Sequence, residues 1–281
     1  MHGGDIMKNK VKLIALDMDG TLTSEDHLTV SEENRAALKR ASENGAKIAI
    51  ATGRTRSILG DVCQQVPEID YIIHSNGAAV FDRKTNGTIY ENPMPWDIAK
   101  RLIDYFNNYE IFLEIYESGM SYAQEDKIPY FSEEVLPKEF LDEALKGMTI
   151  CDDFLETLGG KSIEKITAHI FDKELYGSVW DYLCKSDDLE VTKSFSVGID
   201  ITKAGANKGT AMKSLCEKLG ITPDECMAFG DESNDIPMIT FSKYGFAMEN
   251  ASEACKEAAS YITKSNAESG VAHGINQIMF E

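Results

Sequence analysis

The stretch Leu13-Ile-Ala-Leu-Asp17-Met-Asp19-Gly-Thr-Leu22 decides the fold of this chain and supplies its first candidate site residues. Its apolar half, residues 13–16, predicts a buried parallel strand that delivers Asp17 and Asp19 into the turn at the strand's carboxyl end. Open α/β sheets bind their ligands at that end. Side chains two residues apart on a strand point the same way, so the two carboxylates need a metal ion or a shared proton. Asp-x-Asp-Gly is also common in plain turns, and the other loops of the chain decide between the two interpretations.

Length and composition indicate a soluble globular protein that is large enough for two domains. The chain has 281 residues, of which 43% are hydrophobic and 27% charged. Its apolar runs fall short of the ~18 residues that span a bilayer. The formal net charge of −19 repels nucleic acid and anionic membranes, which excludes both as expected partners. An anionic substrate therefore needs a local pocket made positive by a metal ion, a lysine or an arginine.

The six cysteines are scattered, with no CxxC pair and no spacing typical of metal ligands. This usage indicates free thiols in a reducing compartment, and the chain shows no signal-peptide pattern, so we expect a cytoplasmic protein. A catalytic Cys–His pair is an alternative that no motif supports. No pattern in the sequence predicts an oligomeric state.

Strand and helix patterns alternate at both ends of the chain. After the first strand, apolar runs at 48–51 and 71–73 with a helical spacing between them give a β-α-β-α-β rhythm. The rhythm resumes from 208 to 263. We therefore predict an α/β fold whose core domain, residues 1–82 and 205–281, is a doubly wound, Rossmann-like parallel sheet.

Residues 83–204 interrupt this rhythm and form a predicted second domain. Two β-α-β-β patterns, one beginning near Thr88 and one at Ile163, suggest a duplicated α+β unit with an antiparallel sheet. The acidic stretch 125–160 between them is partly helical by pattern. Because rigid cores tolerate insertions at loops, we expect this α+β domain to be inserted into the core domain.

Two of the remaining loops in the core carry groups that suit a phosphate. Thr52-Gly53-Arg54 follows the second strand and offers a hydroxyl and an unobstructed backbone N–H to a phosphate oxygen. Lys208 begins a predicted helix, where an isolated ammonium opposes the helix dipole. That position is favourable if carboxylates and a phosphate surround the lysine. The structural alternative is an ordinary solvated lysine.

The loop 230–238 places two carboxylates and an amide within five residues, at Asp231, Asn234 and Asp235. Hard oxygen ligands of this kind, together with Asp17, suit an octahedral Mg²⁺. The alternative is an Asx-rich cap before a helix, which explains one of these side chains but not three.

Taken together, these loops resemble the haloacid dehalogenase-like phosphatases, specifically the Cof-type group (subclass IIB) with an α/β cap between the third strand and the lysine. The four family motifs match residues 17–22, 51–54, 207–209 and 230–238. Subfamily marks stand at 75–78, 247–251 and 269–272. The match runs through the whole core in order, whereas the cap is similar only in length and in its strand–helix rhythm.

The resemblance implies a role for each of these core residues. Asp17 would be the nucleophile that forms an aspartyl-phosphate, and Asp19 would protonate the leaving alcohol and later accept a proton from water. Mg²⁺ would be held by Asp17, the Asp19 carbonyl and Asp231. Asp235 would hold Lys208 or a metal-bound water in position without itself binding the metal ion. Thr52 and Lys208 would also take part in catalysis. The phosphoryl group or the rest of the substrate would be bound by Met18, Thr52, Gly53, Arg54, Asn76, Lys208 and Asn234.

The sequence therefore predicts an Mg²⁺-dependent phosphatase of small phosphorylated metabolites, with sugar phosphates first and phosphorylated cofactors such as pyridoxal phosphate or FMN second. A phosphosugar mutase or other phosphotransferase is one alternative, because the same aspartyl-phosphate serves it. A non-catalytic sensor of a phosphometabolite is the other, although it would not need Asp19. Six polar or aromatic residues on the predicted cap strands could contact a substrate, and the alternative is an ordinary place on a sheet face. They are Glu114, Tyr116, Tyr122, Lys165, His169 and Lys193.

Overall fold

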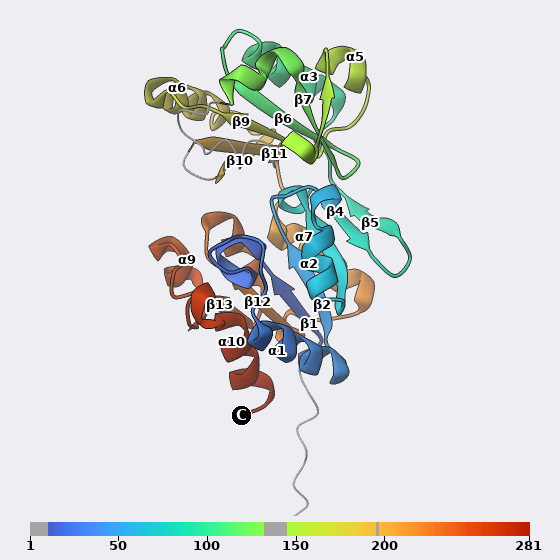
Figure 1. The fold of residues 1–281 in the computed structure, drawn as a ribbon, viewed down its shortest axis with the longest axis vertical. Coiled ribbons are helices and arrows are strands. Elements are labelled where there is room, and N and C mark those ends of the chain that lie inside the picture. The colour runs from blue at the N-terminus through green and yellow to red at the C-terminus, as the bar shows by residue number, and fades with distance from the viewer. Residues whose placement is uncertain (1–10, 132–144, 195–196) are drawn as a thin grey trace, which may run out of the picture.

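The computed structural model describes residues 11–131, 145–194 and 197–281 and contains two β-sheets, one in each half of the molecule (Figure 1). The larger, here called the core sheet, has eight strands in the order β14-β13-β12-β1-β2-β3-β4-β5. Its strands are β1 (Leu13–Leu16), β2 (Lys47–Ala51), β3 (Ile69–His74), β4 (Ala79–Asp82), β5 (Gly87–Glu91), β12 (Cys226–Gly230), β13 (Tyr244–Ala247) and β14 (Tyr261–Ile262). Neighbours from β14 to β3 are parallel, and β4 and β5 add an antiparallel edge.

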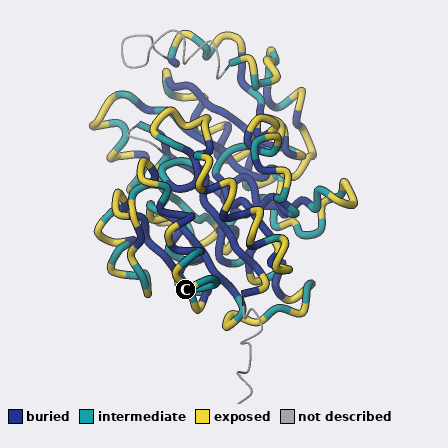
Figure 2. The backbone as a smooth tube through the Cα atoms, turned by 60° about the horizontal axis from the view of Figure 1, so that its bottom comes forward, coloured by how far each residue is buried: buried dark blue, intermediate teal, exposed yellow. Residues whose placement is uncertain are grey.

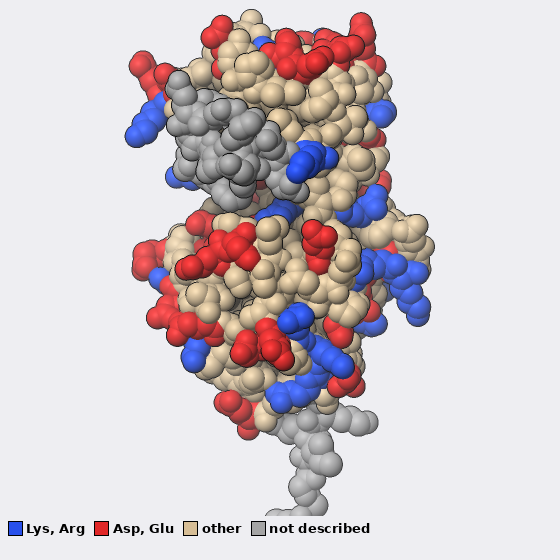
Figure 3. Space-filling view, in the orientation of Figure 1, with Lys and Arg blue, Asp and Glu red and all other residues tan. Residues whose placement is uncertain are grey.

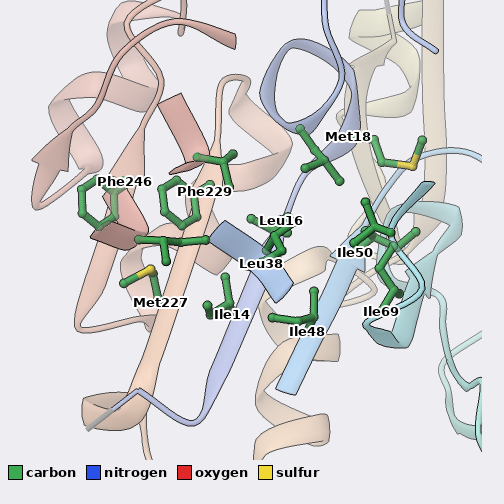
Figure 4. Packing of buried hydrophobic residues seen from close by; sticks show 14 of the residues in the cluster. Ile14, Leu16, Met18, Leu38, Ile48, Ile50, Ile69, Met227, Phe229 and Phe246 are labelled. Carbon is green, nitrogen blue, oxygen red and sulfur yellow. The ribbon is translucent and has the colours of Figure 1, made fainter. Parts of the chain in front are cut away.

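Helices cover both faces of the core sheet, which confirms the predicted doubly wound α/β fold. They are α1 (Glu32–Glu43), α2 (Gly60–Gln65), α7 (Lys208–Leu219), α8 (Ile236–Phe241), α9 (Glu253–Ala258) and α10 (Gly270–Met279). Ile14 of β1 packs in one apolar cluster with Leu38 of α1 and Ile275 of α10 (Figure 4). The next residue, Ala15, lies in a second cluster with Met212 of α7, because successive strand residues face opposite sides. Burying a large apolar side chain in either cluster contributes ~2 kcal/mol to the stability of the fold.

The smaller sheet, here called the cap sheet, has six strands in the order β10-β11-β9-β6-β7-β8. Its strands are β6 (Phe112–Glu117), β7 (Met120–Gln124), β8 (Met148–Cys151), β9 (Lys165–His169), β10 (Leu189–Ser194) and β11 (Gly198–Lys203). Its neighbours are antiparallel except for β7 and β8, which are parallel. The helices α3 (Trp96–Phe106), α5 (Phe154–Leu158) and α6 (Lys173–Leu183) pack on the sheet face that points away from the core sheet (Figure 1).

Four elements differ from the sequence predictions, the first being β4, for which no strand was predicted. The strand expected near Thr88 as the first element of the insertion is β5, and it pairs with β4 in the core sheet, with Phe81 opposite Thr88. The connection between β4 and β5 is short, and short connections favour an antiparallel hairpin. The strand at Thr88 therefore pairs with β4 and does not begin the expected β-α-β-β unit. A strand, β8, lies in the acidic stretch 125–160, of which residues 132–144 lie outside the described residues. The helix α10 was not predicted. The division of the chain at residues 82 and 205 stays a prediction.

The buried residues lie mainly in the strands of both sheets, and the exposed residues lie mainly in the outer turns and on the outer faces of the helices (Figure 2). In the described part of the chain, no helix is both long and apolar enough to cross a membrane.

Two helical glycines with opposite surroundings test the packing of α10 on the core sheet. A Cβ atom at Gly274 of α10 would lie 2.5 Å from the Phe229 ring, whereas one at Gly177 of α6 would meet nothing within 4 Å. We expect Gly274→Ala to lower the free energy of unfolding by ~1–3 kcal/mol because it overpacks a filled site. Gly177→Ala should raise it by ~0.5–1 kcal/mol through helix propensity. Urea unfolding measures both changes, and shifts of the same sign would contradict the packing described.

Candidate active site

The polar loops predicted from the sequence meet at the carboxyl edge of the core sheet. β1 lies between β2 and β12 in parallel register, with Leu16 opposite both Ile50 and Phe229. Because all three strands end at the same edge, Asp17 follows β1 beside the loops that follow β2 and β12. The backbone N–H of Asp17 donates to the Phe229 carbonyl at 3.0 Å, which fixes the turn against β12.

Lys208 is the first residue of α7 and reaches into this edge. Its side chain is 1% exposed, and its Nζ donates to Oδ1 of Asp17 and to Oδ1 of Asp235, each at 2.6 Å. Burial acts to lower the pKa of Lys208, but the carboxylates of Asp17 and Asp235 outweigh burial and raise this pKa above its ordinary value. Lys208 is therefore a buried cation, and two carboxylates offset the unfavourable helix dipole at its position.

Asp235 is held in place on its other side by the backbone of its own loop. Its Oδ2 accepts hydrogen bonds from the N–H groups of Asp231 and Glu232, at 3.0 and 3.1 Å. A Cβ at Gly230 would lie 2.3 Å from the Cβ of Asp235, so only glycine permits this close approach. Both carboxylate oxygens of Asp235 are thus occupied, one by Lys208 and the other by backbone N–H groups. This arrangement fits the predicted role of Asp235 in supporting Lys208 better than direct contact with a ligand.

Asp17, Asp231 and Asp235 form a carboxylate cluster that could bind a metal ion, with one oxygen of each lying within 4.8 Å of the others. Burial, followed by the charge of Asp235, raises the pKa of Asp17 well above its ordinary value and the pKa of Asp231 to about 7. These raised pKa values favour the protonated forms of Asp17 and Asp231 unless a further cation offsets the negative charge of the cluster. Lys208 contacts Oδ1 of Asp17, and the Thr21 hydroxyl donates to Oδ1 of Asp231 at 3.0 Å. The Oδ2 atoms of these two residues and the all-oxygen donor set fit a hard divalent cation such as Mg²⁺.

Asp19 lies beside this cluster with a different set of partners. Arg54 donates to both of its carboxylate oxygens, Nε to Oδ2 at 2.9 Å and Nη2 to Oδ1, and His27 Nδ1 lies 3.1 Å from Oδ1. Burial by itself would raise the pKa of Asp19, but the hydrogen bonds from His27 and Arg54 hold it below its ordinary value. The predicted acid–base residue is thus an ionised carboxylate in this arrangement. No motif in the sequence singles out His27.

The loop after β2 and the turn after β3 lie side by side. The Thr52 hydroxyl accepts from the Arg54 N–H at 3.1 Å, and the Asn76 N–H donates to the Thr52 carbonyl at 3.0 Å. Asn234 Nδ2 donates to Asn76 Oδ1 at 3.2 Å, which joins this pair of loops to the loop after β12. The Met18 side chain is fully buried and packs in the core (Figure 4), so it does not reach into this edge. All of the predicted core residues therefore gather at one edge.

The cap candidates divide into those that approach this edge and those that do not. Lys165 donates to the Gly53 carbonyl at 2.8 Å. His169 packs against the Phe112 and Phe131 rings, with its Nε2 3.8 Å from Oε2 of Glu114. Tyr122 donates instead to Glu117 at 3.4 Å, and Lys193 lies 6.0 Å from the centre of the Trp180 ring. Asp200, which the sequence analysis missed, accepts from Asn76 at 2.7 Å.

Comparison with known proteins agrees with this geometry. A family model of haloacid dehalogenase-like hydrolases matches residues 14–275. The 5-amino-6-(5-phospho-D-ribitylamino)uracil phosphatase YcsE of Bacillus subtilis is 31% identical over 265 residues, which are 94% of each chain. The crystal structure of a haloacid dehalogenase-like hydrolase from Bacteroides thetaiotaomicron superimposes with a TM-score of 0.81 at 29% identity, covering 95% of this chain and 99% of that one.

A second solved structure, the subclass IIB sugar phosphatase BT4131, superimposes with a TM-score of 0.79 at 25% identity and covers 95% of this chain and 98% of its own. The family match spans most of the chain, and both sheets lie within the superimposed region. The chain therefore belongs to the haloacid dehalogenase-like hydrolases, among the Cof-type, subclass IIB phosphatases of that family.

Proposed function

We propose that this enzyme is an Mg²⁺-dependent phosphatase that hydrolyses small phosphorylated metabolites through an aspartyl-phosphate intermediate. The observation that carries the proposal is the buried Asp17, which contacts Lys208 at 2.6 Å and lies beside Asp231 within a carboxylate cluster. A binding protein has no need of a nucleophile paired with a second carboxylate, Asp19, on the same turn. This pairing supports catalysis over a phosphometabolite sensor.

In the first half-reaction, an oxygen of Asp17 attacks phosphorus, and the bond between phosphorus and the ester oxygen breaks. Asp19 gives its proton to the departing alcohol. Lys208 and the Thr52 hydroxyl hold phosphoryl oxygens while the charge builds up, with the Gly53 N–H and Asn234 beside them. A divalent cation bound by Asp17, the Asp19 carbonyl and Asp231 would reduce the repulsion between the nucleophile and the phosphate.

In the second half-reaction, water attacks the aspartyl-phosphate. Asp19 now accepts a proton from that water, and the bond between phosphorus and the Asp17 oxygen breaks to release inorganic phosphate. The contacts of Asp19 with Arg54 and His27 favour the ionised form that this step requires. Asp235 keeps Lys208 in place throughout through its 2.6 Å contact.

The substrate class that we propose is sugar phosphates, with phosphorylated cofactors second. One relative is named for a phosphoribitylamino-uracil substrate, and one structural neighbour is named as a sugar phosphatase. Both compounds join a phosphate to a polyhydroxylated carbon chain. Lysine and arginine side chains lie near the junction of the two halves on the face drawn in Figure 3, amid acidic side chains. These local positive charges would attract an anionic substrate to a protein whose net charge is −19.

The free state of all six cysteines supports the proposal that the enzyme works in a reducing cytoplasm.

We expect Asp17→Asn to reduce the hydrolysis of p-nitrophenyl phosphate by ~10³-fold or more, because an amide cannot serve as the nucleophile. The kcat of purified variants in MgCl₂ measures this, with thermal unfolding as a check of the fold. Asp104→Asn, on an exposed face of α3, is the matched control and should keep wild-type kcat. Substantial turnover by Asp17→Asn would refute the aspartyl-phosphate mechanism.

Among phosphorylated metabolites, we expect sugar phosphates to give the highest kcat/KM and pyridoxal phosphate and FMN lower values. A panel assayed for released inorganic phosphate ranks them. Adding a second sugar as acceptor tests the mutase alternative, since transfer faster than hydrolysis would replace the phosphatase reaction. A panel in which no compound turns over would favour the sensor instead.

The raised pKa of Asp231, about 7, gives Mg²⁺ binding a defined pH dependence. A carboxyl whose pKa is higher in the folded than in the unfolded protein stabilises the fold at low pH, and this stabilisation is lost as the pH rises through about 7. Mg²⁺ competes with that proton, so its stabilising effect should grow over the same range.

We therefore expect Mg²⁺ at ~100 times its Kd to add ~2.7 kcal/mol at about pH 8 and much less at about pH 5.5. Thermal unfolding at both pH values, with and without MgCl₂, measures the difference. Asp231→Asn is the control, and it should remove most of the effect of Mg²⁺ at either pH. Equal stabilisation of the wild-type protein at both pH values would contradict the expectation.

A further inference from the structure

An ion pair between two cap-sheet strands is buried where the cap sheet meets the core. Lys165 on β9 and Asp200 on β11 lie with Nζ and Oδ2 3.0 Å apart, and their side chains are only 2% and 4% exposed. They share one face of the sheet because Asp200 pairs with Thr167, two residues from Lys165. Thr167 donates to Oδ1 of Asp200 at 2.6 Å, and Lys165 Nζ lies 4.2 Å from the centre of the Tyr116 ring. The cap sheet thus holds both side chains in fixed positions.

Both members of this pair also contact core loops at the candidate active site. Lys165 Nζ donates to the Gly53 carbonyl at 2.8 Å, in the loop that carries Thr52 and Arg54. Oδ2 of Asp200 accepts from Asn76 Nδ2 at 2.7 Å. A Cβ at Gly53 would lie 3.5 Å from that same Asp200 oxygen, at ordinary van der Waals distance. The pair therefore bridges the cap sheet to two core loops.

The contact with Asp200 also fixes the orientation of the Asn76 amide. Its NH₂ group points to the Asp200 carboxylate, and its oxygen accepts from Asn234 Nδ2 at 3.2 Å. A flipped amide would set its oxygen against the carboxylate and its NH₂ group against that of Asn234, and both contacts would be repulsive. The charge of Asp200 thus determines which group of Asn76 faces the loop after β12.

The pair has its two core hydrogen-bond partners only while the cap sheet rests on the core. Separation would remove the Gly53 carbonyl from Lys165 and the Asn76 amide from Asp200, and water would replace both. Buried ion pairs are close to break-even against hydration, because desolvation offsets most of the Coulomb attraction. A contact of this kind fixes the alignment of the closed arrangement without making it irreversible.

We propose that Lys165 and Asp200 form a docking pair: two positioning residues that seat the cap sheet on the loops at Gly53 and Asn76 and orient the Asn76 amide toward Asn234. Neither residue reacts with the substrate. They act through the core loops that hold the phosphoryl group, and misplacing such groups by ~1 Å can cost ~10²-fold in rate. The kinetic part of this inference rests on the proposed phosphatase function, whereas the seating of the cap sheet does not.

The test uses the full chain with Lys165→Met and Asp200→Leu combined, because removing both charges leaves no isolated buried ion. We expect the double variant to fold, with kcat for p-nitrophenyl phosphate lowered by ~10²-fold. Small-angle X-ray scattering in MgCl₂ and orthophosphate should give a larger radius of gyration than the wild type. A purely structural role would lower the melting temperature without moving the radius of gyration of the folded protein.

Lys161→Met is the matched control, since Lys161 is also a cap lysine, pairs with Glu117 at 3.3 Å and lies 5.9 Å from the centre of the Tyr122 ring. Its side chain is 46% exposed, and we expect wild-type kcat and radius of gyration. The single variants Lys165→Met and Asp200→Leu should each lose activity, with losses that do not add in the double variant because they remove one shared contact.

A folded double variant that keeps either the wild-type kcat or the wild-type radius of gyration overturns the proposal, as does an equal loss in Lys161→Met. If the wild-type protein hydrolyses no phosphate ester, the proposed function fails, and scattering alone then judges the docking pair. In that case a larger radius of gyration for the double variant supports it, and an unchanged radius overturns it.

Discussion

The contact of one buried ammonium with two carboxylates is the constraint on which the rest of the site depends. Lys208 Nζ lies 2.6 Å from both Asp17 and Asp235, with its side chain 1% exposed. An unpaired charge at this depth would cost several kcal/mol, so α7, the turn after β1 and the loop after β12 are stable only together. The same contact joins three segments that are far apart in sequence. The contact therefore fixes the positions of these three segments relative to one another at the edge that carries the candidate site.

This contact requires α7 to start unusually close to its neighbours. A Cβ at Gly77, whose φ is +94°, would lie 2.3 Å from the backbone of Asn207, and the Asn207 side chain in turn caps α7 by accepting from Thr210 N–H at 2.9 Å. The helix start is thus fixed from both sides, and Lys208 follows directly. The subfamily mark at 75–78 and the lysine motif at 207–209 are one packing unit in the structure, although the sequence separates them by the whole cap.

Local patterns predicted most of the core and failed where partners are distant. The helices predicted at Lys208–Leu219 and around Ile236–Phe241 are present with those bounds, and the candidate residues of the four motifs gather at one edge. The strand at Thr88 was assigned to the wrong sheet because its alternation is the same in either, and only tertiary pairing decides. Asp200 alternates with apolar residues as any sheet-face residue does, and its contact with Asn76 joins residues 124 positions apart. Such contacts leave no local signal.

The two aspartates of the opening turn differ in their electrostatic surroundings, and the difference bears on the order of the reaction. Burial and neighbouring carboxylates raise the pKa of Asp17, while His27 and Arg54 hold that of Asp19 low against the effect of burial. Attack on phosphorus requires the reverse, an ionised Asp17 and a protonated Asp19. Positive charge placed beside Asp17 lowers its pKa, and withdrawal of Arg54 toward a phosphoryl group removes the main cationic partner of Asp19. In the proposed mechanism, loading an anionic ester and a divalent cation into this edge would bring about both changes, whereas the ionised Asp19 described above suits the second half-reaction, in which it accepts a proton from water.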